Sequence, residues 1–152
     1  DPEGMAWFPG QLSPEESRDL VARFEAHFEQ HGFGFWAVER KEDGAFLGTA
    51  GLSIPTFEAP FTPCVEVGWR LARWAWGQGF ATEAARAALT HCFVEVGLRE
   101  ILSWTVPGNQ RSLAVMARLG FQPQGVFEHP RLPLGHPLRL HLLHRLPCDA
   151  WI

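Results

Sequence analysis

The sequence predicts one mixed α/β (α+β) domain, in which a central sheet of parallel and antiparallel strands is flanked by helices. Strand and helix patterns alternate through the second half of the chain, which favours parallel neighbours in a sheet. Paired strand patterns near both ends favour antiparallel edges. The chain has 152 residues, of which 46% are hydrophobic, and this is enough apolar material for one core. We therefore expect residues 1–152 to form a single domain.

The first half of the chain predicts one helix and three strands. Ser13 supplies a hydroxyl that caps a helix, and Gly32 ends that helix. The apolar face of the helix is expected to hold Leu20, Val21, Phe24 and Phe28. Strands at 35–39 and 45–54 are separated by turn residues and predict a hairpin. A third strand at 65–71 alternates in polarity, so it has one apolar face.

The second half predicts two more helices and three more strands. A glycine-rich turn at 76–82 leads into a helix that ends near Gly97. The buried face of this helix is expected to hold Ala81, Ala84, Ala85, Ala88, Leu89, Cys92 and Phe93. So many alanines let the helix lie close to a sheet. The remaining elements are a strand at 101–106, a helix at 110–119 and strands at 121–127 and 138–146.

Composition and charge argue against several classes of protein. Thirteen Lys and Arg against 17 Asp and Glu give a net charge of −4, so we expect no nucleic-acid partner. Apolar stretches are too short for a membrane span, and no secretory signal opens the chain. Cys64, Cys92 and Cys148 are expected to be reduced core thiols of a cytoplasmic protein. The histidines lack an HExxH or CxxC partner, so no metal is expected.

The turn Gly77-Gln78-Gly79 lies between a strand and a helix, and this pattern is typical of an anion site. Glycines leave the backbone accessible, and the first turn of a helix offers unpaired N–H groups and the positive end of a dipole. A tight turn with no ligand is the alternative. The lysine of a Walker loop is absent. Thr82 stands where a dinucleotide fingerprint needs a third small residue, so that fingerprint fits poorly.

Two further patterns extend this turn. Trp69-Arg70-Leu71 precedes the segment WGQGFATEA at 76–84, and VPGNQRS at 106–112 precedes Leu119-Gly120-Phe121. The first pair resembles the acetyl-coenzyme A (acetyl-CoA) motif of GNAT N-acetyltransferases, and the second resembles that family's next motif. The similarity is closest to the RimJ/RimL-like branch, which acetylates protein N-terminal or small-molecule amines. The family usually has a strand and a helix before the position of Asp1, and we expect both to be absent from this chain.

The resemblance implies how acetyl-CoA would bind. The backbone of Trp69 and Leu71 would pair with the amide groups of the pantetheine arm, like an added strand. Asn109 would contact the pantetheine, and Ser112 would lie near the thioester sulfur. The loop expected to hold the pyrophosphate consists of Trp76, Gly77, Gln78, Gly79, Phe80, Ala81 and Thr82.

Acetyl transfer to an amine needs a base, because an alkyl amine is mostly protonated at pH 7, and it needs a donor for the leaving thiolate. Many members of the family use a Tyr as this donor, but the matching position is Met116 and the chain contains no Tyr. Ser112 is then the candidate donor, with a capping role as its alternative. Glu66 is the candidate base, because it points away from the apolar face of its strand; its alternative is a surface carboxylate. His129 and His136 are weaker candidates for contact with substrate.

Acceptor specificity is expected to reside in the loops at 55–63 and 129–137, whose prolines and phenylalanines predict an apolar rim. The sequence does not name the amine, and it leaves a homodimer open. Two other functions stay as alternatives to an N-acetyltransferase. A catalytically silent acyl-CoA-binding sensor module is compatible with the missing Tyr. A nucleotide-binding regulatory domain is disfavoured by Thr82.

Overall fold

A six-stranded mixed sheet organises the computed structural model, which describes residues 13–151. In chain order the elements are α1 (Pro14–His31), β1 (Phe35–Glu39), β2 (Phe46–Ser53), β3 (Glu66–Leu71), the 3-10 turn η1 (Arg73–Ala75), α2 (Phe80–Thr90), the π-helical turn η2 (His91–Val96), β4 (Glu100–Thr105), α3 (Gln110–Leu119), β5 (Gln122–Glu128), β6 (Leu140–Pro147) and the 3-10 turn η3 (Cys148–Ala150). Each predicted helix and strand in this part of the chain is confirmed, and their ends agree within a residue or two.

The strand order is β1-β2-β3-β4-β6-β5. β1, β2 and β3 pair antiparallel, and so do β4, β6 and β5. The two antiparallel halves meet at β3 and β4, which run parallel because α2 carries the chain back between them. This confirms the mixed sheet that the sequence predicts.

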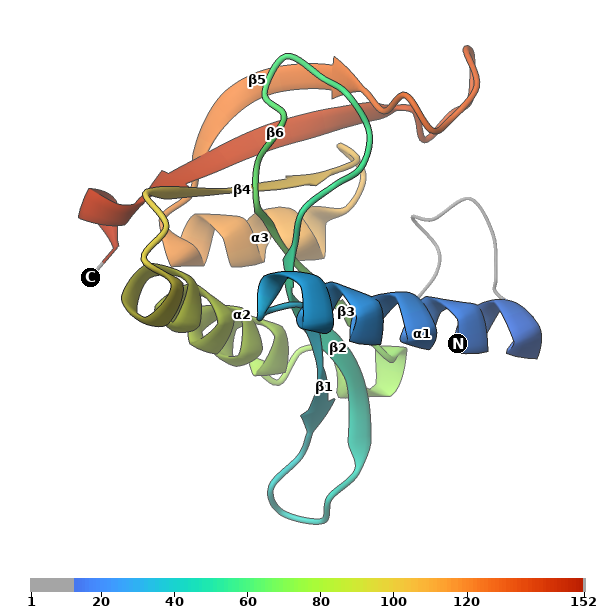
Figure 1. Cartoon of the computed structure of the whole chain (residues 1–152), viewed down its shortest axis with the longest axis vertical. Helices are drawn as coiled ribbons and strands as arrows, with labels where there is room; N and C mark the ends of the chain where they lie inside the picture. The colour runs from blue at the N-terminus through green and yellow to red at the C-terminus, as the bar shows by residue number, and fades with distance from the viewer. Residues whose placement is uncertain (1–12, 152) are drawn as a thin grey trace.

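Helices α2 and α3 cover one face of the sheet and form the main core with it (Figure 1). The short side chains of Ala85 and Ala88, 0% and 3% exposed, let α2 lie close to the strands. From the sheet, Leu52, Val67 and Ile101 reach into this core and are at most 1% exposed. These contacts fix the positions of two helix ends, the start of α2 and the start of α3.

Helix α1 begins as predicted. Ser13 Oγ accepts from the Glu16 N–H, and a Glu16 carboxylate oxygen accepts from the Ser13 N–H, each over 3.1 Å, which makes a capping box. Of the four apolar residues that recur at helical spacing, Leu20, Phe24 and Phe28 are half-buried, and Val21 is 53% exposed. Phe24 packs on Phe35 of β1, with ring centroids 5.0 Å apart.

The cysteine expectation needs one correction. Cys92 is buried in the core and Cys64 is half-buried, but Cys148 is exposed because it begins the turn η3 at the end of the sheet. All three thiols are free. In the stretch 13–151 no helix combines the length and apolar character that a membrane span requires.

Candidate functional site

The parallel strands β3 and β4 separate soon after they begin. Their ladder holds the single pair Glu66↔Leu102, and the hydroxyl of Ser103 then donates to the carbonyl of Val67 over 3.0 Å. Over 68–71 the described sheet gives β3 no strand partner on the side of β4. An extended chain that carries amide groups fits such an open edge as an added strand. Residues Trp69 and Leu71 lie on this edge.

Beyond the open edge, the chain turns into α2 through two glycines in the left-handed region. Gly77 has φ +75° and Gly79 has φ +84°. A Cβ added at either position would meet no atom within 4 Å, so this backbone faces open space. The first bond inside α2 runs from the Glu83 N–H to the Gly79 carbonyl over 3.0 Å. The N–H groups ahead of Glu83 have no acceptor within the helix, as in an anion site.

The hydroxyl of Thr82, in the first turn of α2, adds a second polar group to this end of the helix. Its oxygen is buried and has no hydrogen-bond partner among the described residues. A buried hydroxyl without a partner is costly unless a ligand or water completes it. The glycine turn and Thr82 therefore fit a phosphate group.

The side chains around the turn hold its shape. The indole N–H of Trp76 donates to the Leu71 carbonyl over 2.9 Å, which ties the loop to the end of β3. The side chain of Gln78 is exposed, and its amide donates to the Trp74 carbonyl over 3.1 Å. Phe80 and Ala81, also predicted as part of the pyrophosphate loop, pack under the turn rather than toward its open side.

The start of α3 lies across the gap from β3. Asn109 caps this helix: its side-chain oxygen accepts from the Ser112 N–H over 3.3 Å, and its amide donates to the Thr105 hydroxyl over 3.1 Å. The indole N–H of Trp69 donates to Ser112 Oγ over 3.2 Å. One turn further along α3, Met116 is 1% exposed in the core. Because Ser112 is bonded to Trp69, its hydroxyl is the one on α3 that lies nearest the open edge of β3.

Glu66 lies on the face of β3 opposite to Val67, which points into the core under α2. The residue is half-buried, and burial raises the pKa of its carboxyl group from 4.5 to about 8. Within 13–151 the structure gives this carboxylate no hydrogen bond and no ion pair. A carboxyl group with these properties can take up or release a proton near neutral pH.

His129 and His136, the weaker candidates, both hold the shape of the loop between β5 and β6. The ring Nδ1 of His129 accepts from the Arg131 N–H over 3.3 Å, and that of His136 accepts from the Leu138 N–H over 3.0 Å. Burial, with nearby positive charge, also lowers the pKa of His129 to about 4. A nitrogen that already accepts a backbone N–H is poorly placed to act as a base.

Sequence reasoning missed Arg111. Its guanidinium lies 4.6 Å from the centre of the Trp76 ring, so it spans from the start of α3 to the glycine turn. A cation in the first turn of a helix is disfavoured by the helix dipole, unless an anion offsets it. The positive charge of Arg111 at the start of a helix could have indicated an anion site from the sequence. Only the structure shows that Arg111 lies beside the glycine turn.

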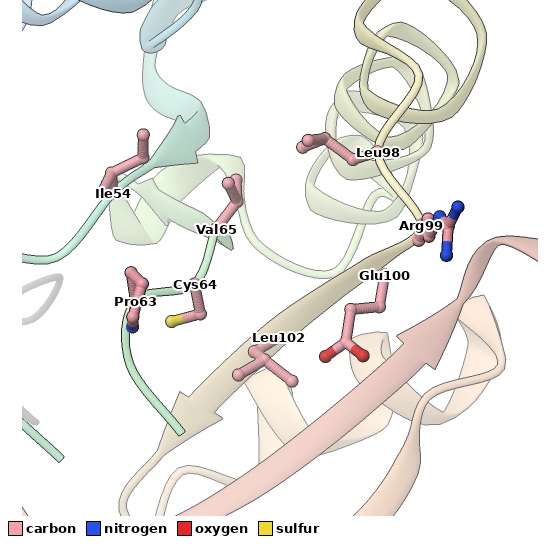
Figure 2. Close-up of a pocket in the computed structure, with 8 residues that line it drawn as sticks. All are labelled: Ile54, Pro63, Cys64, Val65, Leu98, Arg99, Glu100 and Leu102. Carbon is pink, nitrogen blue, oxygen red and sulfur yellow. The ribbon is translucent and has the colours of Figure 1, made fainter. Parts of the chain in front are cut away.

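A separate hollow of about 360 Å³ opens at the other end of β3 and β4, where both strands begin (Figure 2). It is lined mainly by apolar side chains, with Arg99 and Glu100 at its edge. Burial raises the pKa of the Cys64 thiol on its wall to about 12, so this thiol is not a nucleophile at neutral pH. Nowhere in the described residues do three or more His, Cys, Asp or Glu side chains gather as a metal site would need.

One family model matches the part of the chain that contains the open edge of β3, the glycine turn and the starts of α2 and α3. The model of the acetyltransferase (GNAT) domain matches residues 1–122. The chain belongs to the GNAT acetyltransferase family. It is therefore an acyltransferase, and its resemblance to this family is confirmed. The six-stranded mixed sheet with its flanking helices is the GNAT fold.

Relatives and solved structures agree with this assignment of the GNAT domain. The uncharacterized protein YkkB of Bacillus subtilis is 32% identical, over 79% of this chain and 69% of its own length. The uncharacterized N-acetyltransferase p20 of Bacillus licheniformis is 31% identical, over 86% of this chain and 72% of its own. The ribosomal-protein-S5-alanine acetyltransferase of Vibrio fischeri shares the fold with a TM-score of 0.74. It is 21% identical and covers 97% of this chain and 82% of that one.

Proposed function

We propose that this GNAT protein moves an acetyl group from acetyl-CoA to a primary amine, by direct attack of the amine in a ternary complex. The acceptor class is a protein N-terminus or a small-molecule amine, as in the RimJ/RimL-like branch. The observation that carries the proposal is the open edge of β3, which leads straight into the glycine turn at the start of α2. We also infer that residues 1–152 act as one domain, in the cytoplasm.

In this proposal the chain holds the cosubstrate with backbone groups. The edge at Trp69 and Leu71 would pair with the pantetheine amides, although one lone pair of the Leu71 carbonyl is already used by Trp76. The N–H groups of 77–82 and the hydroxyl of Thr82 would hold the pyrophosphate. Arg111 would add a positive charge beside the same phosphates. Asn109 caps α3 and keeps the start of this helix in place, where Asn109 itself would contact the pantetheine.

Acetyl-CoA supplies an acyl group that is activated as a thioester. The amine must lose a proton before it attacks, and Glu66 is the proposed base, because its raised pKa of about 8 brings it near the working range. When the C–N bond forms and the C–S bond breaks, negative charge develops on the sulfur. The hydroxyl of Ser112 is the proposed hydrogen-bond donor to that sulfur, since its oxygen already accepts from Trp69 and its hydrogen is left to donate.

A direct test is to mix the protein with acetyl-CoA and a panel of primary amines, and to follow the released thiol together with the mass of the product. We expect acetylated amine and stoichiometric thiol. CoA binding without any product would point instead to a silent acyl-CoA sensor. Tight binding of ATP or NAD without CoA binding would point to a nucleotide-binding domain.

A further inference from the structure

Six half-buried aromatic rings form a continuous surface that we name the aromatic wall. Its members are Phe57, Phe61, Trp104, Phe127, His129 and His141. Trp104 lies at its centre, with ring centroids 5.7 Å from Phe57, 5.5 Å from Phe61 and 5.8 Å from Phe127. His129 and His141 extend it, 5.1 Å from each other. A cluster of large rings that stays partly open to solvent is unlike a closed core and is typical of a ligand site.

The aromatic wall lies on the same face of the sheet as Glu66. Glu66 of β3 pairs with Leu102 of β4, and Trp104 is two residues further along β4. The side chains of Leu102 and Trp104 therefore lie on the same face of the sheet as the side chain of Glu66. Trp104 pairs with Leu143, and His141, two residues before Leu143, pairs with Phe127. Register alone therefore places Trp104, His141 and Phe127 on one face of the sheet, on the side away from α2 and α3.

Two loops complete the aromatic wall and are joined to each other. The loop at 54–65, which brings Phe57 and Phe61, crosses in front of β4 and β6 (Figure 1). The guanidinium of Arg131, in the loop between β5 and β6, donates to the Thr56 hydroxyl in the first loop. This bond holds the two loops together over the rings. The loops at 55–63 and 129–137, in which the sequence predicts acceptor specificity, thus meet at the aromatic wall.

The charges around the aromatic wall disfavour a ligand with several positive charges, because Arg131 and Arg139 lie beside His129 and Arg70 shares the face of Glu66 on β3. The wall itself contains no carboxylate, and of its flanking acids Glu58 is exposed and Glu128 lies 3.6 Å from the Arg139 guanidinium. Burial lowers the pKa of both His129 and His141, so neither ring repels a cation at neutral pH. Ring faces attract an ammonium group. A polyamine would need several free carboxylates; among the described acids on this face of β3 and β4, Glu66 is enclosed, and Glu100 is paired with Arg145 over 3.0 Å.

We propose that the acceptor is a primary amine with one positive charge and an aromatic ring, and that its ring packs against the aromatic wall. This inference rests on the proposed acetyl transfer and narrows its substrate class. The amine end then points along the face toward Glu66 and the gap between β3 and β4. A flat ring also gains more from this surface than a flexible alkyl chain, because ring-to-ring packing adds to the burial of area.

The test compares 2-phenylethylamine with n-butylamine and spermidine as acceptors. We expect kcat/KM for 2-phenylethylamine to exceed that for either competitor by about tenfold or more. Phe57→Ala should raise KM for 2-phenylethylamine by about tenfold while KM for acetyl-CoA stays unchanged. The matched control is Phe46→Ala, which truncates a phenylalanine that is 61% exposed on β2 and should change neither constant.

Equal or better turnover of n-butylamine or spermidine would overturn this inference and leave acetyl transfer standing. A second measurement is calorimetric titration of 2-phenylethylamine into the wild-type protein and Phe57→Ala, both saturated with CoA, which needs no turnover. Binding to the wild type that Phe57→Ala weakens supports the aromatic wall, even if no amine is acetylated. Absence of binding, or equal binding by the two proteins, refutes it.

Discussion

The indole N–H of Trp69 donates to the hydroxyl oxygen of Ser112 over 3.2 Å, and these residues are 43 positions apart in sequence. The bond crosses the gap between β3 and β4, from the open edge of one strand to the first turn of α3. It occupies a lone pair of the Ser112 oxygen and so turns the hydroxyl hydrogen toward another acceptor. We therefore infer that Trp69 positions the Ser112 hydroxyl, in addition to its proposed backbone role.

We expect Ser112→Ala to lower kcat by about tenfold to a thousandfold, with KM for acetyl-CoA nearly unchanged. A hydrogen bond to a developing thiolate acts mainly in the transition state, and its loss lowers kcat in this way. Steady-state thiol release measures both constants. Turnover at the wild-type rate would leave Ser112 with its capping role and would make water the proton donor.

Trp69→Phe removes the indole donor and keeps an aromatic ring. We expect kcat to fall by a smaller factor, about two- to tenfold, because the Ser112 hydroxyl loses its orientation but stays in place. In a double-mutant cycle, Trp69→Phe should have no further effect on kcat once Ser112 is Ala. An equal loss in both backgrounds would show that the indole acts on kcat by another route.

The sequence predicted the elements well, because their signals are local. The Ser13 cap, the stop at Gly32 and the alternation along β3 each depend on residues within a few positions of one another. The glycine turn was predicted for the same reason, since Gly77 and Gly79 determine the backbone by themselves. The helical spacing of apolar residues in α1 does not show which of them are covered, and Val21 stays exposed in the structure.

The tertiary parts of the site could not be predicted. Nothing in the sequence shows that β3 and β4 separate after one pair, since strand register depends on the whole sheet. The contact of Arg111 with Trp76 joins two segments that only the fold brings together. The burial of Glu66, and with it the raised pKa, likewise depends on the loop and strands around it.

Gly79→Ala should weaken CoA binding by about tenfold or more. The added methyl group would project into the open space where the pyrophosphate is proposed to lie. The matched control is Gly97→Ala at the far end of the same helical segment, where φ is +79° and a Cβ also meets no atom within 4 Å. Both changes add about 1–2 kcal/mol of left-handed backbone strain. Calorimetric CoA titrations that give the same affinity for both variants would contradict the loop assignment.

Arg111→Gln should weaken CoA binding by about three- to tenfold and flatten its salt dependence, because a charge beside the proposed phosphates is lost. The matched control is Arg86→Gln, since Arg86 also lies over an indole, 5.7 Å from the Trp151 ring. Arg86 belongs to the exposed side of α2 and should leave CoA affinity unchanged. Titrations at two salt concentrations measure both effects. Equal CoA affinities for the two variants would show that Arg111 does not bind the phosphates and only packs on the Trp76 ring.

Glu66→Gln should first change how stability depends on pH. The pKa of Glu66 is about 8 in the folded protein, above its ordinary value of 4.5. Between these two values the folded state holds one proton that the unfolded state has released, so the wild-type free energy of unfolding falls as pH rises. Gln cannot ionise, so the variant should gain stability relative to the wild type from about pH 5 to 8. Urea unfolding at several pH values measures this, with Glu95→Gln, an exposed carboxylate, as control.

The same variant tests the base. Wild-type kcat/KM with a strongly basic amine should rise with pH as Glu66 loses its proton near pH 8, and Glu66→Gln should lower kcat/KM and remove that step. A weakly basic amine such as 2,2,2-trifluoroethylamine carries little proton at pH 8 and needs no base, so the variant should acetylate it nearly as fast as the wild type does. The comparison is the ratio of wild-type to variant kcat/KM for the two amines across pH. If both amines lose the same factor, Glu66 shapes the site without taking the proton, and deprotonation falls to solvent.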